Sequence, residues 1–372
     1  MRIILTNGSF YPAQTGGPSN TLYWHAKALQ QRQQQVVVLT TKEGIDNTKH
    51  QITADEWTDR GFGRIKYCSN HVKALWSTLR QLHKEDILHL SSLFYYPAFL
   101  AAIYCYVKGQ RWIWSPRGEC APQALIYSSW KKKPLLAILR KISHKAIFHA
   151  TSPKETAEIK QVFGNDTQVI EFPNYCYLEE KLDVPVEKQL LFVGRIHPIK
   201  AIENLIEAVS LSDAFQQEGF VLKIVGKHDG QQEYFDKLQQ LVKDLQLQGK
   251  VIFAGHQAGA AKLQLFAASY ALVLPSHTEN FGNVVIEALN QGTPVIASAN
   301  TPWELLPATG AGLHVSNAPA SLAAAIDTLI QQSLAAYQQM RQRAFQLCED
   351  QFSIEKNIDK WIGIYDNMKH NS

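Results

Sequence analysis

The chain has 372 residues, of which 45% are hydrophobic and 19% charged, a composition typical of a folded globular protein and not of a disordered one. This length exceeds what one hydrophobic core normally serves and suits two domains of about 180 residues each. No apolar run approaches the roughly 20 residues that cross a bilayer, and five scattered cysteines without a CxxC pair indicate free thiols in a reducing cytoplasm.

Charge is spread unevenly along the chain. Residues 1–178 contain 22 Lys and Arg against 12 Asp and Glu, whereas residues 179–372 contain 15 against 21. A basic half joined to an acidic half predicts two domains with different partners, one of them anionic.

The first half alternates short apolar runs with helical patterns. Its opening, MRIILTNGSF, is too short for a signal-peptide core and is typical of a buried first strand. Helical spacing follows around residues 19–32 and 71–84. Strands are predicted at residues 2–6, 36–40, 86–90, 112–115 and 145–151.

The same rhythm restarts after Pro173 and an acidic link over about 173–188. Further strands are predicted at 190–194, 221–226, 250–255, 270–275 and 294–298, and an amphipathic helix at 352–368. Strand–helix alternation predicts parallel sheets covered by helices on both faces. The fold class is therefore α/β, with two Rossmann-like, doubly wound domains that face a cleft and bind ligands at the carboxyl ends of their strands.

One motif, ENFGNVVIE, places Glu279 and Glu287 on either side of a predicted helix start. The helix should span residues 283–292, so its free N–H groups around residues 282–284 form an anion site. Glu287, one turn inside, can accept hydrogen bonds from paired ribose hydroxyls. Taken alone, the two acids fit a surface helix with two solvated carboxylates better than a ligand site.

Two further loops follow predicted strands. FVGRIHPIK presents Arg195 and Lys200, whose charges suit a diphosphate. Two solvated basic residues in a surface loop would give the same pattern. FYPAQTGGPSN places Gly16 and Gly17 where backbone can approach a phosphate, or where a plain glycine-rich turn is needed.

Together these motifs give the chain a family resemblance. The order Gly-Gly loop, G-R-x4-K and E-x-F-G-x4-E, with SPRGECAPQAL (115–125), FHATSPKE (148–155), FPN (172–174) and TPWELL (301–306), resembles the retaining glycosyltransferases of family 4. Those enzymes have the GT-B fold, and the chain looks most like bacterial members that build lipopolysaccharide, capsule or exopolysaccharide.

The resemblance implies a role for each matching residue. Arg195 and Lys200 would bind the donor diphosphate, Glu287 the ribose and Glu279 the sugar hydroxyls, so Glu279, Arg195 and Lys200 are the candidate catalytic residues. It also implies an acceptor-side domain over 1–178, a nucleotide-sugar-binding domain over 179–352, and a segment over 353–372 that crosses back to the first domain. The remaining donor-binding residues would be Gly16, Gly17, Phe281, Gly282, Asn283 and Val284.

Three positions depart from the family pattern. Ala201 and Tyr175 stand where many relatives have glycine, and Arg117 stands where a histidine often follows SP. Arg117 is therefore the candidate for holding an anionic or hydroxyl-rich group on the acceptor side. No D-x-D motif and no metal-binding histidine spacing occurs, so we expect no metal and no cofactor besides the nucleotide-diphospho-sugar substrate.

The segment WKKKPLLAILRKISHK (130–145) has six basic residues, no acidic residue, and Leu135, Ile138, Leu139 and Ile142 at helical spacing. It predicts either a helix on an anionic membrane surface or one whose apolar side packs on its own sheet. No aromatic platform or recognition motif accompanies the charges, so nucleic acid is not an expected partner.

The leading interpretation is a peripheral, cytoplasmic glycosyltransferase whose acceptor is a glycan or lipid-linked glycan. Alternatives are a sugar-nucleotide epimerase or phosphorylase on a similar scaffold, and a non-catalytic sugar- or lipid-binding partner subunit. The intact charged set of Arg195, Lys200, Glu279 and Glu287 argues against these alternatives.

Overall fold

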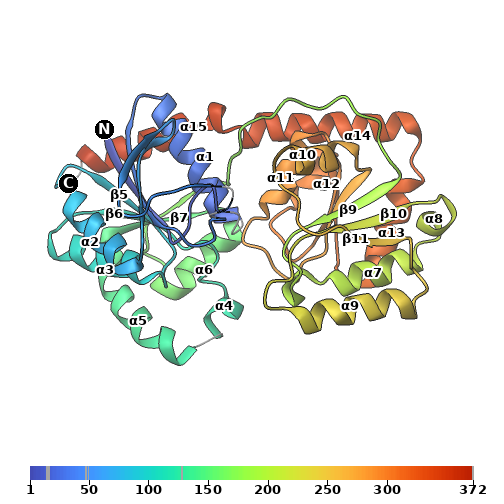
Figure 1. Cartoon of the computed structure of the whole chain (residues 1–372), viewed down its shortest axis with the longest axis horizontal. Coiled ribbons are helices and arrows are strands. Elements are labelled where there is room, and N and C mark those ends of the chain that lie inside the picture. Colours follow the sequence, from blue (N-terminus) through green and yellow to red (C-terminus); the bar gives the residue numbers. More distant parts are fainter. Residues whose placement is uncertain (14–16, 47, 49, 127–128, 371–372) are drawn as a thin grey trace. The chain divides into compact units, whose positions relative to one another are not determined.

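The computed structural model describes residues 1–372 except 14–16, 47, 49, 127–128 and 371–372 (Figure 1). The chain divides into two compact units. The first contains Met1–Tyr177 and the chain from Ile354 onward, and the second contains Leu178–Ser353. Each unit is built on one sheet, so the structure confirms the prediction of two parallel α/β sheets.

The first unit has an eight-stranded sheet in the order β3-β4-β2-β1-β5-β6-β7-β8. All neighbours are parallel except β3 and β4, which form an antiparallel edge. The strand order reverses between β1 and β5, which is the switch point of a doubly wound sheet. The strands are β1 (Arg2–Thr6), β2 (Gln35–Thr41), β3 (Trp57–Arg60), β4 (Gly63–Cys68), β5 (Ile87–Ser91), β6 (Trp112–Ser115), β7 (Ala146–Ala150) and β8 (Val169–Glu171).

Helices cover both faces of this sheet and bury two apolar clusters against it. The last helix, α15, packs on α1 and buries Ile358, Trp361 and Tyr365 in the same cluster as β1. Local caps fix helix starts: Asn70 accepts from Lys73 N before α2. The helices are α1 (Gly17–Gln31), α2 (His71–Gln81), α3 (Tyr96–Val107), α4 (Pro122–Ile126), α5 (Ser129–Ile142), α6 (Pro153–Phe163) and α15 (Ile354–His370).

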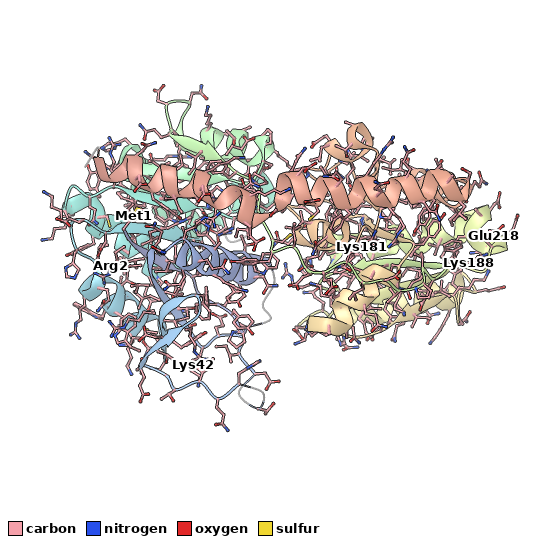
Figure 2. The ribbon with its side chains drawn as sticks, turned by 90° about the horizontal axis from the view of Figure 1, so that it is seen from above. Met1, Arg2, Lys42, Lys181, Lys188 and Glu218 are labelled. Carbon is pink, nitrogen blue, oxygen red and sulfur yellow. The ribbon has the colours of Figure 1, made fainter. Side chains whose placement is uncertain are left out.

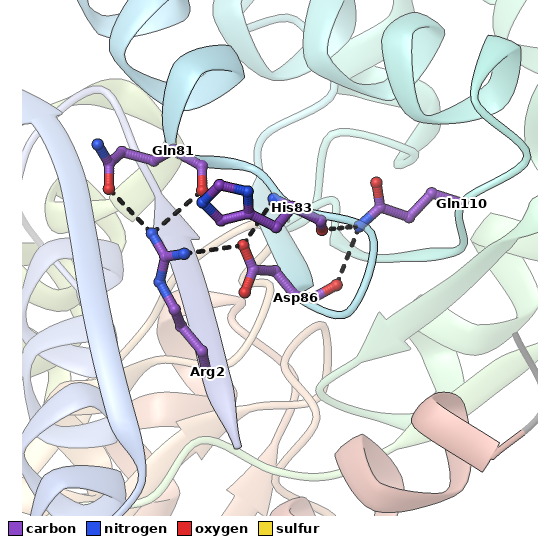
Figure 3. Close-up of polar contacts among 5 residues, drawn as sticks. All are labelled: Arg2, Gln81, His83, Asp86 and Gln110. Atoms are coloured by element: carbon purple, nitrogen blue, oxygen red, sulfur yellow. Dashed lines mark hydrogen bonds and ion pairs between the residues drawn. The ribbon is translucent and has the colours of Figure 1, made fainter.

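The amino edge of the first sheet is closed by a hydrogen-bonded cluster around Arg2 (Figure 3). Arg2 donates to Asp86 and to Gln81, and Asp86 also accepts from His83 N at 2.7 Å. Gln110 donates to the carbonyl oxygens of His83 and Asp86. Because these contacts engage the Asp86 carboxylate and the Gln110 amide, the cluster joins β1, α2 and the α3–β6 loop as a structural element.

The second unit has six parallel strands in the order β11-β10-β9-β12-β13-β14. Its order reverses between β9 and β12, so loops after these two strands meet at one edge. The strands are β9 (Gln189–Val193), β10 (Val221–Val225), β11 (Val251–Phe253), β12 (Ala271–Leu274), β13 (Val295–Ser298) and β14 (Gly312–Val315). The helices are α7 (Ile202–Leu211), α8 (Asp213–Gln217), α9 (Gln232–Asp244), α10 (Gly259–Ala268), α11 (Asn283–Asn290), α12 (Leu305–Thr309), α13 (Pro319–Ile330) and α14 (Leu334–Leu347).

A close backbone approach holds two strand ends of the second sheet together. Gly194 N donates to Val225 O at 3.0 Å, and a Cβ on Gly226 would lie 1.8 Å from Gly194 O. Only glycine fits there, which fixes where the loop after β9 leaves the sheet. Just before β9, Lys188 pairs with Glu218 at 3.0 Å in an exposed contact (Figure 2).

The sequence missed four strands, namely β3, β4, β8 and β14. The apolar side predicted for α5, with Leu135, Ile138, Leu139 and Ile142, was also partly wrong. Leu136, Leu139 and Ile142 are buried against the sheet, whereas Ile138 is 45% exposed. Among the described residues, no helix is both long and apolar enough to cross a membrane.

Candidate functional site

The loop after β9 presents the two predicted cations at the carboxyl edge of the second sheet. Arg195 is exposed, and it forms no hydrogen bond or ion pair with any residue that the structure describes. Lys200 ends a 3-10 turn (Pro198–Lys200) and is mostly buried. Ala201 follows in the left-handed region, with φ 49°, and begins α7. An alanine here accepts a strain that glycine would avoid.

His197 caps that turn in its neutral form. Its Nδ1 accepts from Ile199 N at 3.1 Å. Burial, followed by the charges of Arg195 and Lys200, lowers the pKa of His197. The loop therefore carries its positive charge on Arg195 and Lys200 alone near neutral pH.

The loop between β12 and α11 meets the cationic loop directly. His277 N donates to Ile199 O at 2.9 Å, which ties the two backbones together. The mostly buried Glu279 forms an ion pair with Lys200, and Ser276 Oγ donates to its Oε1 at 2.8 Å. The fold thus brings together Lys200, predicted to bind the diphosphate, and Glu279, predicted to bind the sugar, although they lie 79 residues apart in the sequence.

Gly282 begins α11 and adopts φ 86°, a conformation that favours glycine. A Cβ there would lie 3.2 Å from Leu274 Cδ2 and 3.4 Å from Trp303 Nε1. Glycine provides no side-chain cap for the helix, so the N-terminus keeps the polarity that favours an anion. Asn283 and Val284, in the first turn, are partly exposed.

The ring of Phe281 points into the protein instead of toward a ligand. It is 5% exposed and packs against Trp303 and Phe352, while Trp303 Nε1 donates to Phe281 O at 2.6 Å. The contribution expected from Phe281 to a phosphate–sugar corner is therefore limited to its backbone. Its ring instead fixes the shape of the loop before α11.

Glu287 lies one turn inside α11, as predicted, but it has a partner that the sequence did not indicate. Lys262 of α10 places Nζ 2.6 Å from Glu287 Oε2, with both side chains mostly buried. Nothing in the segment AGAAKLQL distinguishes Lys262 from a surface lysine, so the sequence did not predict its role. The pair forms where α10 packs against α11, which in turn packs against β12.

In the first unit, Gly17 begins α1, and Gly16 lies outside the described residues. Arg117 follows β6 with φ 59°, and Nη1 donates to Asn174 Oδ1 at 3.3 Å. The buried Glu155 accepts from Gly118 N at 2.7 Å and braces this loop. Arg117 Nε is buried and has no hydrogen-bond partner among the described residues. Tyr175, another departure from the family pattern, is buried in the core of this unit.

Arg117 borders a cavity of about 20 Å³, room for about one water molecule. A chain of buried histidines lines it, and burial lowers the pKa of His25 and of His149 to about 3. His149 Nε2 lies 2.9 Å from Phe172 O and must donate, because a carbonyl oxygen only accepts.

That single donor sets the direction of every later bond in the chain. His149 Nδ1 then accepts from Ser115 Oγ, which accepts from His89 Nε2. His89 Nδ1 in turn accepts from Tyr365 OH, which accepts from His25 Nε2. Neutral histidines and one tyrosine of α15 therefore form a polarised hydrogen-bonded chain beneath Arg117.

Comparison with known proteins agrees with this architecture. Residues 179–347 match the family model described as glycosyl transferases group 1. Sucrose-phosphate synthase from Thermosynechococcus elongatus superposes with a TM-score of 0.79 at 21% identity over 100% of both chains. HepE of Anabaena, in complex with UDP and glucose, gives 0.75 at 20% identity over 98% of this chain and 99% of its own. Together with the two parallel sheets, these likenesses establish the GT-B fold.

Curated relatives match shorter stretches. The D-inositol 3-phosphate glycosyltransferase of Mycobacterium marinum is 30% identical over 184 residues, 49% of this chain and 38% of its own length. The enzyme of the same name from Actinosynnema mirum is 37% identical over 114 residues, 30% and 27% of the two chains. The chain thus spans well under half the length of these relatives.

Proposed function

We propose that the chain is a glycosyltransferase that moves a sugar from a nucleotide-diphospho-sugar donor to a hydroxyl acceptor. One observation carries the proposal: Lys200 and Glu279 form an ion pair just before α11, and Glu287 lies one turn inside that helix. Arg195 lies in the same loop as Lys200, and all four residues are within the segment that matches the group 1 model. The solved neighbour that binds UDP and glucose supports a nucleotide-sugar donor.

Each group has a physical task in this proposal. The exposed Arg195 guanidinium and the N-terminus of α11 stabilise the charge that develops on the departing diphosphate. Glu279, held by Lys200 and Ser276, accepts hydrogen bonds from sugar hydroxyls. Glu287 accepts from the ribose. In this proposal Arg195 and the N-terminus of α11 take the place of a metal ion at the leaving group.

The finer assignment follows the sequence resemblance. We propose retention of configuration, as in family 4, and a glycan or lipid-linked glycan acceptor of the bacterial surface-polysaccharide type. The curated relatives carry a different name, D-inositol 3-phosphate glycosyltransferase, so the acceptor is the part of the proposal most in need of a test.

A donor screen tests the reaction. The protein is incubated with UDP-, GDP- and ADP-sugars and a mixed set of glycan, lipid-linked and inositol phosphate acceptors, and nucleotide release is measured. Acceptor-dependent release of one nucleotide diphosphate, with the anomeric configuration of the product established by NMR, is the expected result. Interconversion of sugar nucleotides without an acceptor would identify an epimerase instead. Binding without turnover would identify a non-catalytic subunit.

Association with an anionic membrane through α5 is the remaining part of the proposal. The burial of α5 limits which of its side chains could contact lipid. The buried side of α5 belongs to its own domain, and Lys132 donates to Ala124 O beneath the helix. Lys133, Arg140 and Lys141 are exposed, so any contact with lipid is mainly electrostatic.

Vesicle sedimentation tests that contact. The protein should bind phosphatidylglycerol vesicles at low salt and detach at high salt, and replacing Lys133, Arg140 and Lys141 with Gln should weaken binding. Replacing the exposed Lys237 and Lys243 of α9 with Gln is the control. Equal binding of both variants, or no binding by the wild type, would remove the membrane from the proposal.

A further inference from the structure

The ion pair between Lys262 and Glu287 has features that a purely structural surface pair lacks. Nζ of Lys262 lies 2.6 Å from Oε2 of Glu287, and the side chains retain only 22% and 16% of their exposure. The ammonium also lies 5.6 Å from the ring centroid of the buried Phe266, one turn further along α10. The lysine is thus anchored on two sides.

The two oxygens of Glu287 have different surroundings. Oε2 is buried beside the ammonium and accepts no hydrogen bond from the described residues. The exposure that the side chain retains therefore lies on atoms other than Oε2. A carboxylate fixed on one oxygen by a cation presents the other in a defined direction, and less rotamer freedom is lost when a ligand binds.

We propose that Lys262 is a positioning residue for the donor nucleoside, whose ribose hydroxyls donate to the Glu287 carboxylate that Lys262 holds in place. This inference rests on the proposed function, because it assumes that Glu287 meets the ribose. Lys262 acts through Glu287. Its removal should therefore weaken ligands that carry a ribose diol and spare ligands that lack one.

Calorimetry on the full chain tests this coupling. The probe is whichever of UDP, GDP and ADP binds the wild type most tightly, together with its 2′,3′-dideoxy analogue. Lys262→Met should weaken the ribonucleotide about tenfold, the scale of one lost charge-assisted contact, and change the dideoxy analogue less than about twofold. Lys262→Gln provides a second variant. Lys237→Met, which removes the exposed Lys237–Glu233 pair, should change neither ligand.

A double variant separates action through Glu287 from direct contact. In a Glu287→Gln background, Lys262→Met should cause no further loss of ribonucleotide affinity. Equal weakening of both ligands by Lys262→Met, unchanged affinity for the ribonucleotide, or full additivity with Glu287→Gln would overturn the inference while leaving the proposed function in place. If the wild type binds none of the three diphosphates, the proposed function fails and this inference fails with it.

Discussion

The buried histidine chain of the first unit should make the stability of that unit fall steeply in mild acid. Burial, followed by the charges of His149 and Arg117, lowers the pKa of His25 from 6.5 to about 3. Burial and then Arg117 lower the pKa of His149 to about 3 as well. Below about pH 6.5 these histidines become protonated in the unfolded chain, whereas in the folded unit they stay neutral down to about pH 3. The free energy of unfolding therefore decreases as the pH falls through that window.

The magnitude follows from the size of the shifts. One pKa unit corresponds to about 1.4 kcal/mol, so each of these histidines should remove about 2 kcal/mol of stability between pH 7.5 and pH 5. Above about pH 7.5 neither should contribute any pH dependence. The pKa of His89 is lowered too, chiefly by burial, and adds to the effect in the same direction.

The assay is urea unfolding at pH 7.5 and pH 5, followed by tryptophan fluorescence. Of the eight tryptophans only Trp303 belongs to the second unit, so the signal reports chiefly on the first. His149→Gln can still donate to Phe172 O and accept from Ser115, but it cannot be protonated. Its loss of stability between the two pH values should be smaller than that of the wild type by about 2 kcal/mol.

His144→Gln is the matched control, since His144 is exposed in the same unit. It should reproduce the pH dependence of the wild type. If His149→Gln also shows the unaltered pH dependence, His149 is not held neutral by its surroundings and the polarised chain is misassigned.

The other predictions concern the donor site. Arg195→Ala and Lys200→Ala should each lower kcat/KM at least about tenfold through lost charge-assisted contacts, whereas Lys188→Ala, on an exposed pair, should not. Turnover should survive EDTA, and activity that is abolished by EDTA and restored by Mg²⁺ would contradict a metal-independent reaction. Glu287→Gln should weaken the free nucleotide diphosphate and the intact donor alike, by about 10- to 150-fold for a charge-assisted bond. Glu279→Gln should weaken only the intact donor, and an equal loss for the free nucleotide would refute the division between the two acids.

The sequence by itself determined the elements that depend on local pattern. Continuous apolar runs predicted nearly all the inner strands, because parallel strands are buried on both faces. The edge strands β3 and β14, and β4 beside β3, are short or partly exposed, so their periodicity is weak. The start of α11 at Asn283 also followed from the sequence. A glycine next to a helical pattern marks a helix end, and Gly282 indeed adopts a positive φ there.

Only the tertiary structure decided which side chains share a site. The Lys200–Glu279 pair joins the loops after β9 and β12, which the strand order places side by side. The Lys262–Glu287 pair depends on the packing of α10 against α11. The histidine chain likewise draws His25, His89 and His149 from three elements and closes with Tyr365 of the last helix. Local pattern is set by neighbours along the chain, whereas charge pairing and proton placement are set by neighbours in space. For that reason the sequence predicted Lys200, Glu279 and Glu287, whereas only the fold showed which of them pair and that Lys262 holds Glu287.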